Sequence, residues 1–161
     1  MPNAKPFVGH LQTVESAWTD YNGHLNMAYY GVMFDRAADE LFAEFGCDAD
    51  YIIRTNCSTF VLETHTSYAN ELKAGEQVRI ESRIIGFDQK RVHYVQQMFR
   101  AESLYLACVL ELITSHVDLT TRRTAAFPTD ILAKIEAMAA AQASLPLPPQ
   151  LGHVIGLPSK R

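Results

Sequence analysis

The 161-residue sequence predicts an α+β fold in which one long α-helix packs against a mostly antiparallel β-sheet. Three observations indicate this class. A helical pattern is clear over residues 27–45. Four segments with strand character then follow one another, joined by short turns, as in a meander. A second helical pattern begins at Pro128. The predicted order is therefore one strand, one helix, four strands and one helix, in a chain long enough for a single domain.

The first part of the chain predicts a strand over 6–14, a loop over 15–26 and then the long helix. Asn26 is suited to cap a helix, and Gly46 is suited to end one. Between them, apolar residues recur at steps of three and four on one face: Tyr30, Phe34, Ala37, Leu41 and Phe45. The opposite face carries acidic residues, including Asp35 and Asp39, which we expect to be solvated.

The middle of the chain predicts strands over 58–72, 77–87, 91–100 and 104–119. In the second of these, Val78, Ile80 and Ile84 alternate with polar residues, which is the period of a half-buried strand. The last is apolar on both sides, so we expect it to be central and covered. A long strand with few charges at an edge of the sheet would favour pairing with a second subunit.

The end of the chain predicts a helix over 128–143, opened by Pro128. The segment after it is too rich in proline and glycine for regular structure. We therefore expect a single domain over 1–145 and a C-terminal tail over 146–161.

Composition excludes several classes of function. A net charge of −4 argues against a broad nucleic-acid surface, and no apolar run is long enough to span a membrane or serve as a signal peptide. The three cysteines are widely spaced, which argues against a disulfide framework or a zinc site. We expect a cytoplasmic protein with no metal and no cofactor.

The stretch WTDYNGHLNMAYY, residues 18–30, places polar chemistry directly before the long helix. Two interpretations are open. Asp20 can begin an ordinary turn over Asn22 and Gly23, with Asn26 as a helix cap. Alternatively, Asp20 is a catalytic carboxylate aimed at the helix start, where the first N–H groups lack partners and can stabilise an oxyanion.

The Asp-x-x-Gly-His-x-Asn loop, the long helix and the four strands after it resemble the hotdog-fold acyl-CoA thioesterases of the 4-hydroxybenzoyl-CoA thioesterase type, over about residues 6–125. The stretches WTDYNGH, FDRAADEL, VLETH and FDQKRVH are most similar to the betainyl-CoA thioesterase group of carnitine breakdown. This resemblance implies the hotdog fold, an antiparallel sheet wrapped around a long central helix.

The resemblance also implies roles for individual residues. Asp20 falls on the carboxylate that attacks the thioester carbonyl or activates water, and the Met27 N–H falls on the group that polarises the thioester oxygen. Lys90 and Arg91 fall on the hairpin that meets the CoA phosphates, although they are also ordinary turn residues. The implied assembly is a homodimer or homotetramer with the site between subunits, and the implied partner is a coenzyme A thioester.

Further candidates come from the residues themselves. Gly23 permits a positive φ or close approach of a ligand. His24 can bond the thioester, orient Asp20 or brace the loop, and Asn26 can contact substrate as well as cap the helix. Glu63 and His65 lie two residues apart, so their side chains share one face of their strand. If that face meets the helix start of the partner subunit, Glu63 is a second candidate base and His65 is its neighbour. Otherwise they are polar residues on the outer face.

The expected reaction is hydrolysis of a short acyl-CoA, with betainyl-CoA as a candidate. The trimethylammonium group of a betainyl substrate would favour contact with aromatic faces. The aromatic residues expected near the loop are Trp18, Tyr21, Tyr29, Tyr30 and Phe60. The alternative is that these residues only pack in the core. The alternatives are a hotdog dehydratase or hydratase and a non-catalytic acyl-CoA-binding protein. The sequence lacks the proline-containing motif of the hydratases and has no DNA-binding segment of the kind that acyl-CoA sensors carry.

Overall fold

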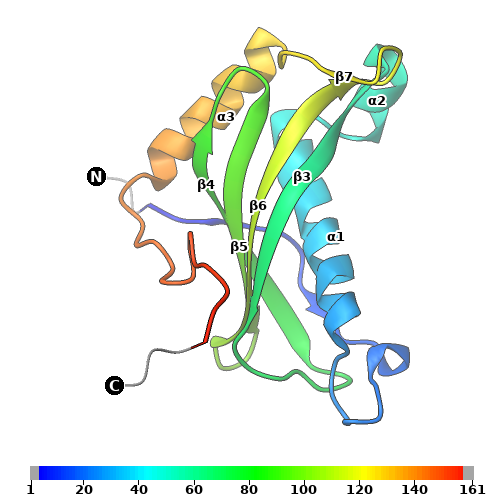
Figure 1. Ribbon diagram of the computed structural model, residues 1–161, viewed down its shortest axis with the longest axis vertical. Helices are drawn as coiled ribbons and strands as arrows, with labels where there is room; N and C mark the ends of the chain where they lie inside the picture. Colours follow the sequence, from blue (N-terminus) through cyan, green and yellow to red (C-terminus); the bar gives the residue numbers. More distant parts are fainter. Residues whose placement is uncertain (1–3, 158–161) are drawn as a thin grey trace.

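The computed structural model describes residues 4–157 and consists of one antiparallel sheet with a long helix along one face (Figure 1). Its elements are β1 (Phe7–Val8), β2 (Gln12–Thr13), the 3₁₀ turn η1 (Ser16–Trp18), α1 (Met27–Phe45), α2 (Ala49–Thr55), β3 (Cys57–Tyr68), β4 (Gln77–Phe87), β5 (Arg91–Arg100), β6 (Tyr105–Asp118), β7 (Arg123–Thr124) and α3 (Thr129–Gln142).

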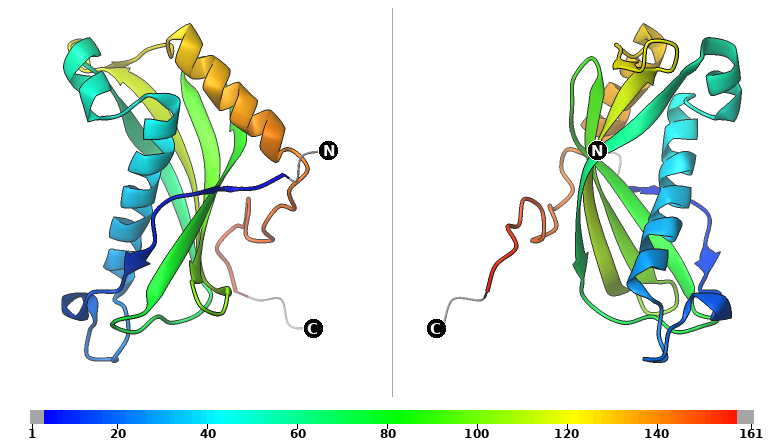
Figure 2. Two further views of the ribbon diagram at one scale, coloured as in Figure 1. Left: turned by 180° about the vertical axis from the view of Figure 1, so that it is seen from behind. Right: turned by 45° about the vertical axis from the view of Figure 1, so that its right-hand side comes forward.

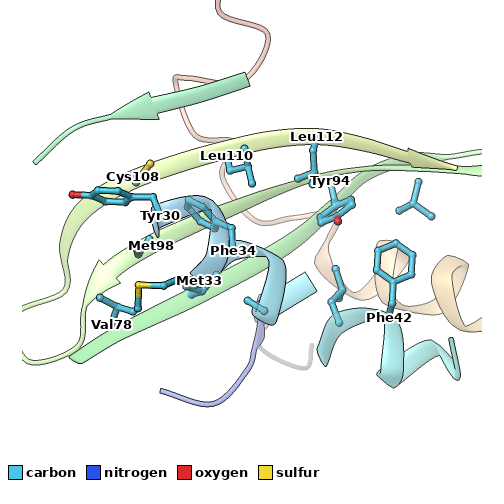
Figure 3. Close-up of a cluster of buried hydrophobic side chains, with 14 of the residues drawn as sticks. Tyr30, Met33, Phe34, Phe42, Val78, Tyr94, Met98, Cys108, Leu110 and Leu112 are labelled. Atoms are coloured by element: carbon cyan, nitrogen blue, oxygen red, sulfur yellow. The ribbon is translucent and has the colours of Figure 1, made fainter. Parts of the chain in front are cut away.

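The long helix predicted over 27–45 is confirmed, including both of its ends. The Asn26 Oδ1 accepts a hydrogen bond from the Ala28 N–H at 3.0 Å, and Gly46 closes the helix with φ of 93°. One face of α1 enters the core against β4, β5 and β6, as Figure 3 shows. Its buried residues are Tyr30, Met33, Phe34, Ala37, Leu41, Phe42 and Phe45.

The strand order is β1–β4–β5–β6–β3, so the predicted meander of four strands is wrong in one respect. β4, β5 and β6 form a meander, but β3 lies beyond β6 rather than beside β4. The reason is the segment between β3 and β4, which crosses beneath the start of α1. There Leu72 is fully buried, and its carbonyl accepts a hydrogen bond from the Leu25 N–H at 2.7 Å. Burial of Leu72 favours the crossing over a tight hairpin.

The N-terminal strand predicted over 6–14 is split into β1 and β2, which both pair with β4. Between them the chain turns toward α1, because the His10 N–H donates to Glu40 Oε2 at 2.7 Å instead of joining the sheet. The sequence did not indicate α2, which is too short to show a helical period. Asp48 caps α2 by accepting from the Tyr51 N–H at 2.8 Å, and Asn56 ends it with φ of 51°.

The two edges of the sheet differ. On the β4 side, β1 and β2 cover part of the edge, and the Gln142 side chain bonds the Ile84 N–H and the Ser82 carbonyl where a strand would otherwise pair. On the other side β3 ends the sheet, and within the described residues no strand lies beyond it. The long exposed strand edge expected from the sequence is therefore that of β3, while β6 is interior as predicted.

α3 and the tail cover other parts of the sheet. α3 packs beside β4, where Ile131 and Ile135 join the core. The tail then runs over the face opposite α1, as Figure 2 shows, and the Gly152 N–H donates to Glu111 Oε2 at 2.6 Å. The helices within residues 4–157 include none long and apolar enough to cross a bilayer.

Replacing Gly46 with alanine is expected to lower the free energy of unfolding by about 1–2 kcal/mol, because an L-residue is strained in the left-handed conformation. A Cβ there would meet only Lys134 Nζ, at 3.5 Å, so the cost comes from the backbone and not from a clash. Gly46→Asn is the matched control and should cost less, since asparagine tolerates this conformation. Equal losses in a urea titration would contradict this explanation.

Candidate active site

A cavity of about 550 Å³ opens at the start of α1. Its walls come from the loop before α1, the first turn of α1, the end of β3 and the chain that follows it: Asp20, Tyr21, Asn22, His24, Leu25, Asn26, Met27, Tyr30, Tyr68, Ala69, Asn70 and Glu71. The structure thus brings together the acid, the histidine and the helix start that the sequence singled out. Gly23 belongs to the same loop, where its φ of 78° allows the turn to close.

Asp20 is held at the mouth of this cavity by its own loop. Its Oδ1 accepts from the Asn22 N–H at 2.9 Å, and its Oδ2 accepts from the Asn26 Nδ2 at 3.1 Å. The Asn22 N–H lowers the pKa of the Asp20 carboxyl below its ordinary value. Burial opposes this shift less strongly, and the Asn26 amide adds a further, smaller lowering. Asp20 therefore begins a turn and also presents an ionised carboxylate to the cavity, so the two interpretations from the sequence do not exclude each other.

The first N–H of α1 is available to a ligand. The Ala28 N–H is bonded to the Asn26 side chain, and the Tyr29 N–H donates to the Asn26 carbonyl at 3.0 Å. The Met27 N–H makes no hydrogen bond to any described residue. Met27 lines the cavity, so its N–H can meet a developing negative charge there, with the helix dipole adding to the attraction.

Three further residues shape the cavity. His24 is half-buried, and its Nε2 lies 3.9 Å from Glu71 Oε2. The Tyr30 hydroxyl donates to the Asn70 carbonyl at 3.4 Å, and the Tyr68 hydroxyl donates to the Met27 carbonyl at the same distance. Tyr68, Asn70 and Glu71 were not singled out from the sequence. Tyr68 ends β3, and Asn70 and Glu71 reach the site because the chain after β3 crosses under α1; no local pattern signals that crossing.

Glu63 and His65 lie on the other face of the sheet. Thr64 and Thr66 are paired with Leu112 and Leu110, which face α1, so the alternating Glu63 and His65 point away from α1. They line a separate cavity of about 390 Å³ with His93, Glu111 and His153. Within one chain the structure does not bring them to Asp20.

Lys90 and Arg91 lie in the β4–β5 hairpin, at the end of the sheet opposite the Asp20 loop (Figure 1). Both backbone N–H groups donate to Asp88 Oδ1, at 2.7 and 2.8 Å. The Arg91 guanidinium pairs with Asp88 Oδ2 at 2.9 Å. The Lys90 ammonium forms no ion pair with the described residues.

The aromatic residues expected to surround an ammonium group do not form one cage. Trp18 is buried and stacked on Tyr29, with ring centroids 5.4 Å apart, and the Arg36 guanidinium lies 5.1 Å from the Trp18 ring. Tyr21 is 98% exposed, and Phe60 lies under the Arg122 guanidinium. Of the five, Tyr21 and Tyr30 line the cavity at the start of α1.

This fold, with a carboxylate loop feeding the central helix, defines a thioester hydrolase of the hotdog type, and comparison with known proteins agrees. The chain belongs to the thioesterase-like superfamily, which it matches over residues 14–135. The hotdog fold expected from the sequence is confirmed.

Three relatives illustrate the similarity. A betainyl-CoA thioesterase of Pseudomonas aeruginosa is 38% identical over 89% of this chain and 91% of its own length. An L-carnitine dehydrogenase/betainyl-CoA thioesterase of Ruegeria pomeroyi is 33% identical over 96% of this chain, which spans 31% of that longer protein. A hypothetical protein of Staphylococcus aureus, solved in complex with CoA, superposes with a TM-score of 0.90 at 30% identity, covering 96% of this chain and 97% of its own.

The two roles of Asn26 can be separated by substitution. Asn26→Ser keeps a capping oxygen but loses the amide N–H that reaches Asp20, and Asn26→Ala loses both. We expect the pKa of Asp20 to rise toward its ordinary value of 3.8 in both variants, since each removes a donor to the ionised form. Only Asn26→Ala should lose about 1 kcal/mol of stability.

The measurements are an NMR titration of the Asp20 carboxyl and a thermal melt of each variant. In the unsubstituted protein the carboxyl should stay ionised below pH 3.8, because its pKa is lowered. A titration unchanged in both variants would show that the Asn26 amide does not act on Asp20.

Proposed function

We propose that the protein hydrolyses a short acyl-CoA, with betainyl-CoA as the leading substrate, at the cavity beside Asp20. The observation that carries this proposal is that an ionised carboxylate and an unpaired helix N–H, those of Asp20 and Met27, face one cavity. Attack on a thioester needs these two elements: a group that adds to the carbonyl carbon or activates water, and a donor for the resulting oxyanion.

The reaction follows one of two routes. As nucleophile, an Asp20 oxygen adds to the carbonyl carbon, the C–S bond breaks, and CoA leaves as a thiolate. Water then hydrolyses the mixed anhydride and restores the carboxylate. As general base, Asp20 takes a proton from water, and the resulting hydroxide adds to the same carbon. The C–S bond then breaks, CoA leaves, and the proton on Asp20 passes to the departing thiolate or to solvent. In both routes the Met27 N–H stabilises the oxyanion, and His24 is placed to bond the thioester or protonate the leaving sulfur.

The lowered pKa of Asp20 keeps its carboxylate ionised at neutral pH, as both routes require. A single turnover in ¹⁸O-labelled water separates the two routes. Hydrolysis of the anhydride at the Asp20 carbonyl leaves the label in the enzyme, whereas general-base catalysis places it in the acid product.

The named relatives support the choice of substrate. The Pseudomonas aeruginosa relative is a betainyl-CoA thioesterase, and the similarity covers nearly all of both chains. The Staphylococcus aureus structure contains CoA in the same fold. We further propose a cytoplasmic location, where the unpaired thiols of Cys47, Cys57 and Cys108 would remain reduced.

A homodimer is part of the proposal, and its support is the open edge of the sheet. β3 exposes backbone groups along that edge together with Val61 and Leu62, which are 52% and 57% exposed. Two copies that pair through β3 about a twofold axis perpendicular to the sheet run antiparallel and keep both α1 helices on one face. The α1 start of one copy then lies toward the α1 end of the other.

The same symmetry gives the remaining candidates a place in the proposal. It moves the Lys90–Arg91 hairpin of one subunit to the end of the assembly that carries the Asp20 loop of the other. There the Lys90 ammonium, which is free of ion pairs within the described chain, is suited to a CoA phosphate. Glu63 and His65 remain a second site on the outer face, where a tetramer contact or the CoA moiety would meet them.

Asp20→Asn is expected to lower kcat by at least about 100-fold, as for a group that acts mainly in the transition state. The melting temperature should change little, since the carboxylate lies at the surface of its loop. Release of free thiol from betainyl-CoA measures the rate. Glu63→Gln is the matched comparison and should retain most activity. Near-normal turnover by Asp20→Asn would remove Asp20 from the mechanism and turn attention to Glu63.

Light scattering at micromolar concentration is expected to give at least twice the 18.0 kDa mass of the chain. Leu62→Lys should weaken the assembly and the activity together, because a charge on the β3 edge opposes pairing. Leu104→Lys, at a position 60% exposed in the β5–β6 turn, is the control and should leave both unchanged. An active 18 kDa monomer would defeat the intersubunit site.

A further inference from the structure

The loop that carries Asp20 is closed at its base by backbone contacts. Thr19 and Leu25 form an antiparallel bridge, and the Asn26 N–H donates to the Trp18 carbonyl at 2.9 Å. The loop is therefore a closed unit, and Trp18 and Asn26 form the base by which it joins the rest of the chain. Its position on the molecule depends on the contacts that hold these two residues.

The side chain of Trp18 contacts two residues of α1. Its ring is buried and stacks on Tyr29, with ring centroids 5.4 Å apart and planes inclined by 10°. The Arg36 guanidinium carbon lies 5.1 Å from the centroid of the Trp18 ring. Tyr29 and Arg36 are seven residues apart, so they share one face of α1. A parallel aromatic pair and a guanidinium over an indole ring are both favourable contacts. We call these three residues the Trp18 stack.

The segment before the loop is attached at the same place. The Trp18 N–H donates to the Glu15 carbonyl at 3.0 Å, and the Arg36 Nη1 lies 4.0 Å from Glu15 Oε1. Because both side chains of this ion pair are about half exposed, it adds little by itself. The Trp18 stack is therefore the main side-chain attachment of this part of the chain to the outer face of α1.

Asn26 connects the Trp18 stack to the Asp20 carboxylate. Its backbone N–H is bonded to Trp18, its Nδ2 donates to Asp20 Oδ2 at 3.1 Å, and its Oδ1 accepts from the Ala28 N–H at 3.0 Å. The backbone of Asn26 thus depends on Trp18 for its place. A displacement of Trp18 would move Asn26, and with it the donor that holds Asp20.

The Trp18 stack does not line the cavity at the start of α1, so its residues do not contact a ligand there. Its effect is on the two groups that do. Asp20 lies within the loop, whereas the Met27 N–H belongs to the first turn of α1, so the distance between them depends on how the loop sits on the helix. Attack on a carbonyl group requires reacting atoms about 3–3.5 Å apart, and a misplacement of about 1 Å can cost about 100-fold in rate.

We propose that the three residues of the Trp18 stack are positioning residues: by fixing the base of the loop on α1, they set the place of the Asp20 carboxylate relative to the Met27 N–H. This inference rests on the proposed function, in which both groups act on one thioester carbonyl. The stack acts through Asn26 and not through contact with the substrate.

The kinetic test begins with Tyr29→Leu, which removes the stacked ring and keeps a good helix former in α1. We expect kcat for release of thiol from betainyl-CoA to fall about tenfold, as for a misplacement of less than about 1 Å. KM should change little, because the stack lies outside the cavity lining. Tyr29→Phe keeps the ring and should retain kcat. Arg36→Ala should lower kcat by about two- to fivefold, for the loss of an exposed cation–π contact.

Arg100→Ala is the matched control. It removes a guanidinium that lies 4.8 Å from the Tyr105 ring, away from the cavity lining, and it should keep kcat. A thermal melt shows that each variant is folded at the assay temperature.

Trp18 is the only tryptophan of the chain, so its fluorescence reports on the stack directly. Acrylamide should quench this fluorescence weakly in the unsubstituted protein, where the ring is buried, and more strongly in Tyr29→Leu and Arg36→Ala. The Asp20 carboxyl gives a second readout. In Tyr29→Leu its pKa should rise toward the ordinary value of 3.8, because a displaced Asn26 amide no longer lowers it.

Three outcomes for Tyr29→Leu would overturn the inference: a normal kcat although Trp18 has become accessible, a lower kcat with an unchanged Asp20 titration, or unchanged quenching. Each would leave the proposed thioesterase intact, since Asp20→Asn tests that function separately. Near-normal turnover by Asp20→Asn would defeat the proposed function and this inference together.

Discussion

The burial of one face of α1 against the sheet is the constraint on which the rest of the structure depends. Seven residues of that face are buried, and they fix both the rotation of the helix and the position of its first turn. With this face turned inward, the Met27 N–H opens into the cavity beside Asp20, and Asp35 and Asp39 face outward. A rotation of α1 that removed these features from their places would also expose Phe34 and Leu41.

The loop before α1 shows how one side chain can serve stability and chemistry at once. Asn26 uses its carbonyl oxygen to cap the helix and its amide nitrogen to hold Asp20. This cap leaves the Met27 N–H without a hydrogen bond to the described residues. Asn26 therefore positions the Asp20 carboxylate and leaves the Met27 N–H available to a ligand. The polar residues that precede α1 thus form a turn, cap the helix and supply a candidate catalytic site.

The unequal edges of the sheet connect the fold to the proposed assembly. β1, β2 and Gln142 cover the β4 side, whereas the β3 side is long, carries exposed apolar residues and has only one charge, that of Glu63. A second copy on this edge would continue the sheet from one subunit into the other.

The sequence by itself determined the elements whose signals are local. The helical period of the apolar residues predicted α1, and Asn26 and Gly46 predicted its two ends. Strict alternation of apolar and polar residues predicted β4. Contacts between distant residues decided the rest. Burial of Leu72 favours the crossing that places β3 beyond β6, and the bond from His10 to Glu40 divides the first strand. The crossing chain also brings Asn70 and Glu71 to the site. The sheet placed Glu63 and His65 away from Asp20, because the face a strand residue occupies depends on which strand it pairs with, and pairing is a property of the whole fold.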